Sequence, residues 1–339
     1  MTPPTVSVLI VNWNRGDLLR LAVQSMLNQT WRDLEVVVVD NGSSDGSIAA
    51  LQRAVEDPRL RYELLPENRG IADGINHGVK QCAGRFIALM DSDDVCDPRR
   101  IELQMAALAA EPALSGVGCD ARLVDEAGHP FGELRLLHAP EDIRLYAAYN
   151  MPLHHPSLLL RREIFDVLQY RNPFVLSSDF DFITRAVEAG HRFAALPLLL
   201  CDYRRHTASS TVARADYAKL STAVVRIAAS RRAGSRPEDI PGLKALVERW
   251  SSAGTPVWRA YLELAATSRR ERAHVVACLH AALAVREKPG WQTAAAYLWS
   301  LMLALTSEPR AVSLALEGVT KGPFWLLLKR KGFPAFPRY

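Results

Sequence analysis

The fold is decided by the stretch from Leu34 to Asp45, which reads LEVVVVDNGSSD. Its four consecutive valines are β-branched and apolar, so they predict a strand that is buried on both faces. Asp40, Asn41 and Gly42 follow at once and are typical turn residues, so the strand is expected to end there. A buried strand that stops at a polar turn is typical of an α/β sheet whose ligand lies beyond the carboxyl ends of its strands.

The same pattern recurs on both sides of this stretch. Further apolar strands are expected at residues 6–12, 61–64 and 86–90. Helices are expected between the strands at residues 17–29, 45–55 and 74–82. Strands that alternate with helices in this way predict a parallel, doubly wound α/β sheet.

The character of the sequence changes near residue 212. Strand signals fade beyond it, and helical periodicity with many alanines and arginines takes over, interrupted by prolines at helix-hairpin spacing. We therefore expect two domains, an α/β domain at residues 1–212 and a basic α-helical C-terminal region at residues 213–339.

The composition is that of a globular protein. The chain has 339 residues, of which 49% are hydrophobic and 23% are charged, so it can bury a full core without disulfides or a structural metal. Its five cysteines contain no Cys-x-x-Cys pair, which argues against a zinc ribbon, a thioredoxin-type site and a secreted disulfide framework. No signal peptide or membrane-spanning helix is expected, because no apolar run reaches the ~20 residues that spanning requires. We expect reduced thiols and a cytoplasmic location.

Charge is distributed unevenly along the chain. Residues 1–212 hold 21 Lys and Arg against 28 Asp and Glu, whereas residues 213–339 hold 20 against 9. The basic half also contains the apolar segment Ala294–Leu305 and the tail Phe324–Lys331, which reads FWLLLKRK. These features predict peripheral attachment to the inner face of the cell membrane. The alternative, that these apolar residues pack onto the first domain or form a dimer, stays equally open. No nucleic-acid partner is expected.

Acidic residues cluster directly after the expected strand 86–90. Asp91, Asp93 and Asp94 would repel one another unless solvent or a cation offsets their charge. Mg²⁺ or Mn²⁺ suits such oxygen ligands, with substrate phosphates and water completing the coordination shell. The alternative is a solvated acidic turn that caps the helix expected after Pro98. Asp40 could likewise accept a hydrogen bond from a base or ribose, or simply stabilise an Asx-turn.

The order of the motifs resembles that of family 2 glycosyltransferases of bacterial type, which are inverting enzymes with the GT-A fold. The resemblance begins at the opening strand VSVLIVNWNR, residues 6–15. It continues through SMLNQT (25–30), VDNGSSD (39–45), ENRG (67–70) and ALMDSDD (88–94). It ends with HHPS (154–157), SDFD (178–181) and YRRH (203–206), so it covers about residues 5–210.

The resemblance implies a role for individual residues. Asp179 would be the general base that deprotonates the acceptor hydroxyl. Asp93 and His206 would hold a divalent metal ion, Mg²⁺ or Mn²⁺, and His154 and His155 would lie on the acceptor side. The residues expected to contact the nucleotide sugar are Asn12, Arg15, Asp40, Asn41, Arg69, Asp91 and Asp93.

Three positions depart from the family's pattern. Asn41 and Ser178 stand where the family often has acidic residues, and Ile75 stands where it frequently has an arginine before Asn76. If that arginine normally steadies phosphate, Arg69 or Arg204 would have to replace it.

The expected activity is transfer of a sugar from a nucleotide diphosphate sugar, most commonly a UDP-sugar, to a hydroxyl of a glycan or lipid-linked acceptor. The expected product is a cell-surface glycan: polysaccharide, lipopolysaccharide or glycolipid. A Rossmann dehydrogenase and a P-loop enzyme are excluded, because neither GxGxxG nor GxxxxGK[ST] is present. The alternatives are a sugar-phosphate nucleotidyltransferase, which should open with a glycine-rich basic loop, and a non-catalytic sugar-nucleotide-binding or scaffold protein. Intact Asp93 and Asp179 argue against the latter. The sequence leaves the donor sugar, acceptor, linkage and oligomeric state open.

Overall fold

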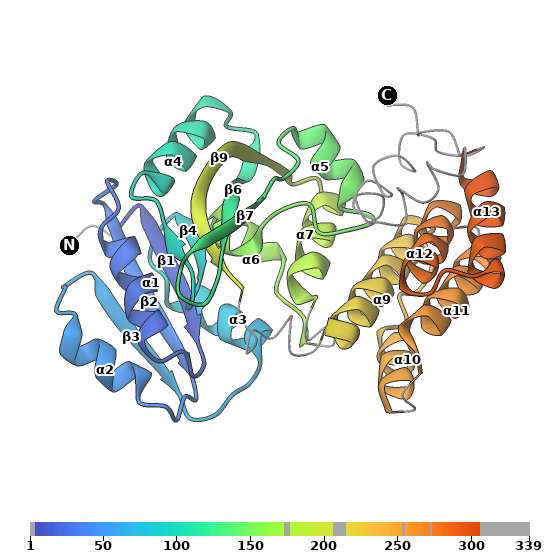
Figure 1. Cartoon of the computed structure of the whole chain (residues 1–339). Coiled ribbons are helices and arrows are strands. Elements are labelled where there is room, and N and C mark those ends of the chain that lie inside the picture. The colour runs from blue at the N-terminus through green and yellow to red at the C-terminus, as the bar shows by residue number, and fades with distance from the viewer. Residues whose placement is uncertain (1–3, 173–176, 206–214, 253–254, 272, 306–339) are drawn as a thin grey trace. The chain divides into compact units, whose positions relative to one another are not determined.

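A computed structural model of the chain describes residues 4–172, 177–205, 215–252, 255–271 and 273–305 (Figure 1). His206 and the tail Phe324–Lys331 lie outside these residues. The chain divides into two compact units, Met1–Arg144 with Met151–Ala213, and Leu145–Asn150 with Arg214–Tyr339. The sequence gives no sign that the short segment Leu145–Asn150 groups with the C-terminal helices. None of the helices described has both the length and the hydrophobicity that a membrane crossing requires.

The first half of the sheet is parallel, as predicted. Its strands lie in the order β3-β2-β1-β4, all parallel, and have the bounds β1 Val6–Asn12, β2 Leu34–Asn41, β3 Leu60–Leu65 and β4 Phe86–Asp91. The helices that connect them are α1 Asp17–Leu27, α2 Ser47–Ala54 and α3 Ile71–Gln81. The register pairs Asn12 of β1 with Asp40 of β2, and Val11 with Asp91 of β4. The polar ends of three strands therefore meet at one edge of the sheet.

The second half of the sheet is mixed, which the parallel pattern predicted from the strands within residues 6–90 does not cover. Beyond β4 come β8 (Leu159–Arg161), β6 (Leu114–Val124), β9 (Arg192–Arg204) and β5 (Val95–Cys96), while β7 (Pro130–Leu134) pairs with β6. β8 is antiparallel to both β4 and β6, whereas β9 is parallel to β6 with several register shifts. β8 follows the short 3-10 turn His155–Ser157. Its three residues are too few to give a strand signal in the sequence.

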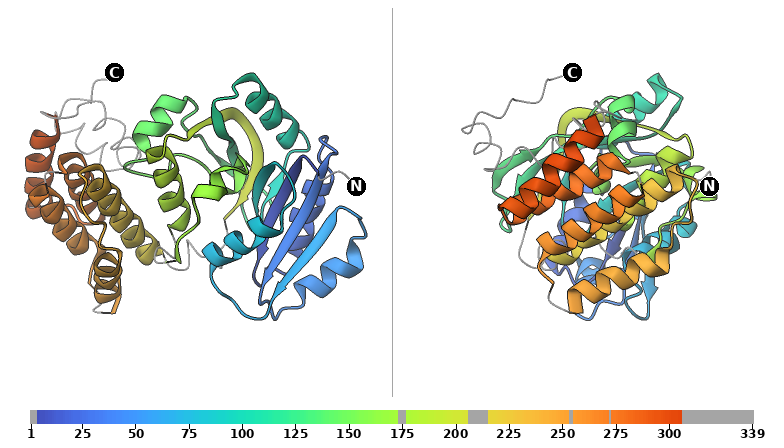
Figure 2. Two further views of the ribbon diagram at one scale, coloured as in Figure 1. Left: turned by 180° about the vertical axis from the view of Figure 1, so that it is seen from behind. Right: turned by 90° about the vertical axis from the view of Figure 1, so that its right-hand side faces the viewer.

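The remaining elements are helical. The first unit adds α4 Arg100–Ala110, α6 Ile164–Val167 and α7 Ser178–Glu188, and α5 Pro140–Tyr146 spans the point where the units divide. The second unit consists of α9 Ala215–Ala233, α10 Ile240–Ser252, α11 Val257–Arg270, α12 His274–Glu287 and α13 Trp291–Leu305 (Figure 2). Within it α12 packs against both α11 and α13. The Ala-rich periodicity of the C-terminal sequence thus forms helices, as expected.

Helices cover both faces of the parallel strands (Figure 1). Val8 and Val38 pack with the buried side of α1 in one cluster, and side chains alternate along a strand, so Leu9 and Val39 point to the opposite face. There α3 approaches closely at Gly78, where a Cβ would come within 2.3 Å of a Leu9 methyl carbon. This close packing fixes the strand ends, and with them the polar residues that follow.

Candidate active site

The strand ends form the floor of the candidate site, where Asn12 joins β1 to the turn after β2. Asn12 is fully buried, and its Nδ2 donates to Asp40 Oδ1 at 3.0 Å and to the hydroxyls of Ser43 and Ser47, each at 3.1 Å. The Asp40 carboxylate also accepts the Ser43 N–H at 3.1 Å. Asp40 therefore stabilises the turn after β2, as the Asx-turn alternative predicted. Asn12 Oδ1 is buried and has no hydrogen-bond partner among the residues described.

Asn41 anchors the loop that precedes α3. Its Nδ2 donates to Asn68 Oδ1 and to the Gly70 carbonyl, both at 3.1 Å, and its Oδ1 accepts the Arg69 N–H at 3.0 Å. The amide of Asn41 is thus used within the protein. Gly42, with φ +74°, allows the loop to approach, since a Cβ there would lie 2.5 Å from the Glu67 carbonyl carbon. The structure leaves the Arg69 side chain exposed and fixes its backbone.

The acidic loop after β4 is held by two arginines. Arg15 Nε lies 3.0 Å from Asp93 Oδ2, and both side chains are mostly buried. Arg204 donates its backbone N–H to Asp94 Oδ1 at 2.8 Å and its Nε to the Asp93 carbonyl at 2.9 Å. Arg204 Nη1 also binds the backbone carbonyls of Asp125 and Glu126. Arg204 therefore shapes the acidic loop, which is a different role from the phosphate contact considered for it from the sequence.

Negative charge is concentrated at this loop. Burial and the neighbouring Asp93 raise the pKa of Asp91 to about 7, against the opposing effect of Arg15. Burial, together with Asp91 and Asp93, also raises the pKa of Asp94 well above its ordinary value. Asp94 Oδ2 is buried and has no hydrogen-bond partner among the residues described. Crowded carboxylates of this kind are stabilised by a cation.

The donor set fits a hard divalent cation that is only partly bound by protein. Within the described ranges, no group of three or more His, Cys, Asp and Glu side chains is arranged to hold a metal ion. Mg²⁺ commonly takes one or two carboxylates and completes its octahedron with water and substrate phosphates. Asp93, beside the unsatisfied Asp94 oxygen, matches that requirement. His206, the second expected ligand, is not among the residues described.

Asp179 lies in this site although it is far from the acidic loop in sequence. Its negative charge contributes to the raised pKa of Asp91 and, after burial, to that of Tyr170. Its Oδ1 accepts the N–H of Phe180 at 2.8 Å in the first turn of α7. Asp179 in α7 therefore lies near enough for its charge to act on Asp91 at the end of β4, although the two residues were predicted from separate motifs.

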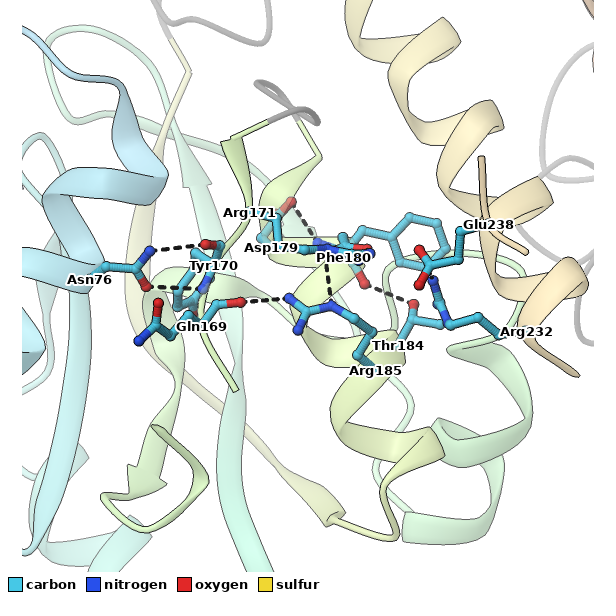
Figure 3. A network of polar contacts seen from close by, with 11 residues as sticks. Asn76, Gln169, Tyr170, Arg171, Asp179, Phe180, Thr184, Arg185, Arg232 and Glu238 are labelled. Atoms are coloured by element: carbon cyan, nitrogen blue, oxygen red, sulfur yellow. Dashed lines mark hydrogen bonds and ion pairs between the residues drawn. The ribbon is translucent and has the colours of Figure 1, made fainter. Parts of the chain in front are cut away.

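A polar network holds the segment beside Asp179 in place (Figure 3). Asn76 of α3 exchanges two hydrogen bonds with the backbone of Tyr170, both at 2.9 Å. Asp181, fully buried, accepts Arg171 Nε at 2.8 Å and Arg185 Nε at 2.9 Å. The sequence analysis did not predict a role for these residues. The i,i+4 spacing of Asp181 and Arg185 was the one sequence pattern that could have indicated the network.

The two histidines expected on the acceptor side differ. His155 Nε2 lies 2.8 Å from the Tyr170 hydroxyl, and Asp179 partly offsets the lowering of the His155 pKa that burial causes. His154 packs against Tyr203 with ring centroids 4.7 Å apart, and burial lowers its pKa to about 3. His155 therefore borders the site, whereas His154 is a neutral packing residue.

Sequence comparisons agree with this geometry. Residues 7–168 match the family model described as glycosyl transferase family 2. An uncharacterized glycosyltransferase of Methanocaldococcus jannaschii is 25% identical over 228 residues, which cover 65% of this chain and 77% of that protein. The succinoglycan biosynthesis protein ExoO of Rhizobium meliloti is 28% identical over 230 residues, which cover 63% of this chain and 65% of that protein.

The fold has also been seen in a solved structure. The mannosyltransferase PcManGT from Pyrobaculum calidifontis, in complex with GDP-Man and Mn²⁺, superposes with a TM-score of 0.52. The match covers 95% of this chain and 88% of that one at 20% sequence identity, which establishes a shared GT-A fold. Together, the motif order, the GT-A architecture and the family match show that residues 7–168 belong to a family 2 glycosyltransferase domain.

Proposed function

We propose that the protein transfers a sugar from a nucleotide diphosphate sugar to an acceptor hydroxyl, with a divalent metal and with inversion at the anomeric carbon. The observation that carries the proposal is that Asn12, Asp40 and Asp91 meet at one edge of the sheet, beside the ion pair of Arg15 with Asp93. This edge is where a ligand of an α/β sheet binds, and the negative charge of Asp179 acts on Asp91 there.

The donor side of the reaction rests on the strand ends and the acidic loop. Asp93 would hold the metal, and Asp91 would contact the ribose. The metal, when bound, offsets the charge that develops on the departing diphosphate. Arg15, 3.0 Å from Asp93, adds a positive charge at the same place. Asn12 and Asp40 shape the turn on which the base of the nucleotide would lie. Asn41 holds the loop that carries Arg69.

The acceptor side rests on Asp179. Its Oδ1 accepts the Phe180 N–H, so we assign the transferred proton to Oδ2. As Asp179 removes the proton, the acceptor oxygen attacks the anomeric carbon in line with the bond to diphosphate, which inverts its configuration. His155, bonded to Tyr170, borders this side. A product that retains the anomeric configuration of the donor sugar would rule out this single displacement.

The donor and the acceptor are proposed at the level of chemical class. UDP-sugars remain the expected donors, although the solved mannosyltransferase holds GDP-Man. ExoO is named for succinoglycan biosynthesis, which supports a cell-surface polysaccharide as the product. A screen of UDP-, GDP- and dTDP-sugars for slow hydrolysis with Mn²⁺ would identify the nucleotide.

Peripheral attachment to the inner face of the cell membrane is proposed for the C-terminal unit. Leu298 and Trp299 of α13 are 48% and 59% exposed, and the region carries the excess of basic residues described above. Sedimentation with anionic liposomes should weaken with salt and should fall when residues 324–339 are removed. Absence of binding at low salt would favour packing within the protein or a dimer.

Metal-dependent donor binding tests the proposal. In a calorimetric titration, the nucleotide diphosphate is added to the protein in the presence of Mn²⁺. Binding should be tight for the wild type and weak for Asp93→Asn. Asp33→Asn is the matched control, because Asp33 is exposed just before β2, at the opposite edge of the sheet. Equal binding by all three proteins would overturn the metal role of Asp93.

A further inference from the structure

Three of the five cysteines form one buried cluster in the first unit. Cys96, Cys119 and Cys201 are 5%, 0% and 2% exposed. The Sγ atoms of Cys96 and Cys201 lie 3.2 Å apart, and those of Cys119 and Cys201 lie 3.8 Å apart. Cys82 and Cys278 are buried elsewhere. The proposed sugar transfer uses none of these thiols.

The backbone places Cys96 and Cys201 in the best position for a cross-strand disulfide. They are directly opposite each other on the antiparallel strands β5 and β9. The Asp97 N–H donates to the Leu200 carbonyl at 2.9 Å, so the next pair along is hydrogen-bonded and the cysteine pair is not. Non-hydrogen-bonded pairs bring Cα atoms to about 4.5 Å, inside the range of about 4.4–6.8 Å that disulfides span.

Arg100 gives all three sulfurs a positive neighbour and contacts Cys96 directly. Arg100 is fully buried, and its Nη1 lies 3.1 Å from Cys96 Sγ while its Nη2 donates to the Leu89 carbonyl at 2.9 Å. No carboxylate pairs with it within the described part of the chain. A buried guanidinium without a counter-charge favours the thiolate form of the sulfur that it contacts. Burial nevertheless raises the pKa of the Cys96 thiol well above its ordinary value, and Arg100 offsets only part of that rise.

We propose that Cys96 and Cys201 are a redox-active dithiol, which a small disulfide such as glutathione disulfide oxidises to an intramolecular disulfide. When β5 opens, the Cys96 thiol loses its proton to solvent, and its sulfur attacks one sulfur of the oxidant and releases the first thiolate. The Cys201 thiol then loses its proton and displaces the second. Two protein thiols become one disulfide, and the oxidant leaves as two thiols. β5 has only two residues and ends the sheet order, so local opening can admit the oxidant.

The disulfide would join the two segments that hold the acidic loop. Cys96 comes two residues after Asp94, and Cys201 comes three before Arg204, which binds both Asp94 and the Asp93 carbonyl. Bond formation moves the sulfurs from 3.2 Å to about 2.0 Å, so the strands need only a small adjustment. The oxidised protein should stay folded with β5 fixed to β9.

Peptide mapping of the folded, full-length protein tests the proposal. The protein is incubated with glutathione disulfide, free thiols are alkylated after unfolding, and the digest is analysed by mass spectrometry. A Cys96–Cys201 cross-linked peptide should appear, and alkylation of both residues should fall at least tenfold, while Cys82 and Cys278 stay alkylated. Reduction with dithiothreitol should restore alkylation.

Variants decide which cysteines take part. Cys119→Ser should keep the cross-link, and Cys201→Ser should abolish it. A Cys119–Cys201 cross-link, glutathione adducts alone, or full alkylation of Cys96 after treatment would each overturn the proposal. The wild-type map does not depend on the folding of any variant. The cross-linking experiment does not test Asp93 or Asp179, so its outcome leaves the proposed transfer reaction unaffected.

Discussion

Replacing Asp181 by asparagine should destabilise the first unit strongly. The carboxylate is fully buried and accepts hydrogen bonds from Arg171 at 2.8 Å and Arg185 at 2.9 Å. Asparagine keeps the shape but removes the charge, so both guanidinium groups lose their counter-ion. Removing one partner of a buried ion pair costs about 3–5 kcal/mol. The arginine side chains are 27% and 13% exposed, so solvent recovers part of that cost. We expect a loss of about 2–3 kcal/mol in the free energy of unfolding.

Urea unfolding followed by far-UV circular dichroism measures this loss. Asp166→Asn is the matched control, because Asp166 is exposed on α6 of the same unit, and it should change stability by less than about 0.5 kcal/mol. Asp181 lies in the first turn of α7 with Asp179, so Asp181→Asn should also slow transfer more than it weakens donor binding. A loss below about 1 kcal/mol would refute the view that this carboxylate holds the network together.

Three further predictions concern packing, pH and metal. Burial lowers the pKa of His154 to about 3, so the stability that its neutral form gives is fully present above pH 6.5 and declines as the pH falls. Between pH 7 and pH 5 the wild type should lose about 2 kcal/mol more than His154→Phe in urea unfolding, and equal losses would contradict the burial of a neutral imidazole. Gly78→Ala should cost about 1–3 kcal/mol by overpacking. The reason is that its Cβ would lie 2.3 Å from Leu9 Cδ1 and 2.8 Å from Val39 Cγ2, whereas Gly290→Ala, in open space, should leave the denaturation midpoint unchanged. EDTA should abolish calorimetrically detected donor binding and added Mn²⁺ should restore it; binding that persists in EDTA would exclude the proposed metal.

Local sequence patterns predicted the half of the fold in which strand and helix signals are strong. The valine run of β2 is buried on both faces, and this burial determines both the strand and the covering helices. Once β1, β2 and β4 are parallel neighbours, Asn12, Asp40 and Asp91 must end at one edge. The mixed half could not be predicted, because the three-residue β8 gives no pattern and the bulged pairing of β6 with β9 depends on tertiary packing.

The sequence predicted which residues belong to the candidate site, but not the hydrogen bonds that hold them in place. The family motifs predict that Asp179 and Asp93 share one site, and in the structure the charge of Asp179 in α7 acts on Asp91, two residues before Asp93. The roles of Asn41 and Arg204 in holding loops were not predictable. Side-chain hydrogen bonds to a backbone that is distant in the sequence leave no periodic pattern. The Asn76–Tyr170 contact spans 94 residues and could be found only in three dimensions.

The transfer rate of Asp179→Asn, measured with saturating donor and Mn²⁺, tests the central claim most directly. Donor binding should stay at the wild-type level, because Asp179 would touch the acceptor and not the nucleotide. Transfer should fall by about 10²–10⁴-fold, the usual cost of losing a general base. Near-normal transfer by this variant would contradict the assignment of Asp179 as the base, and with it the proposed mechanism.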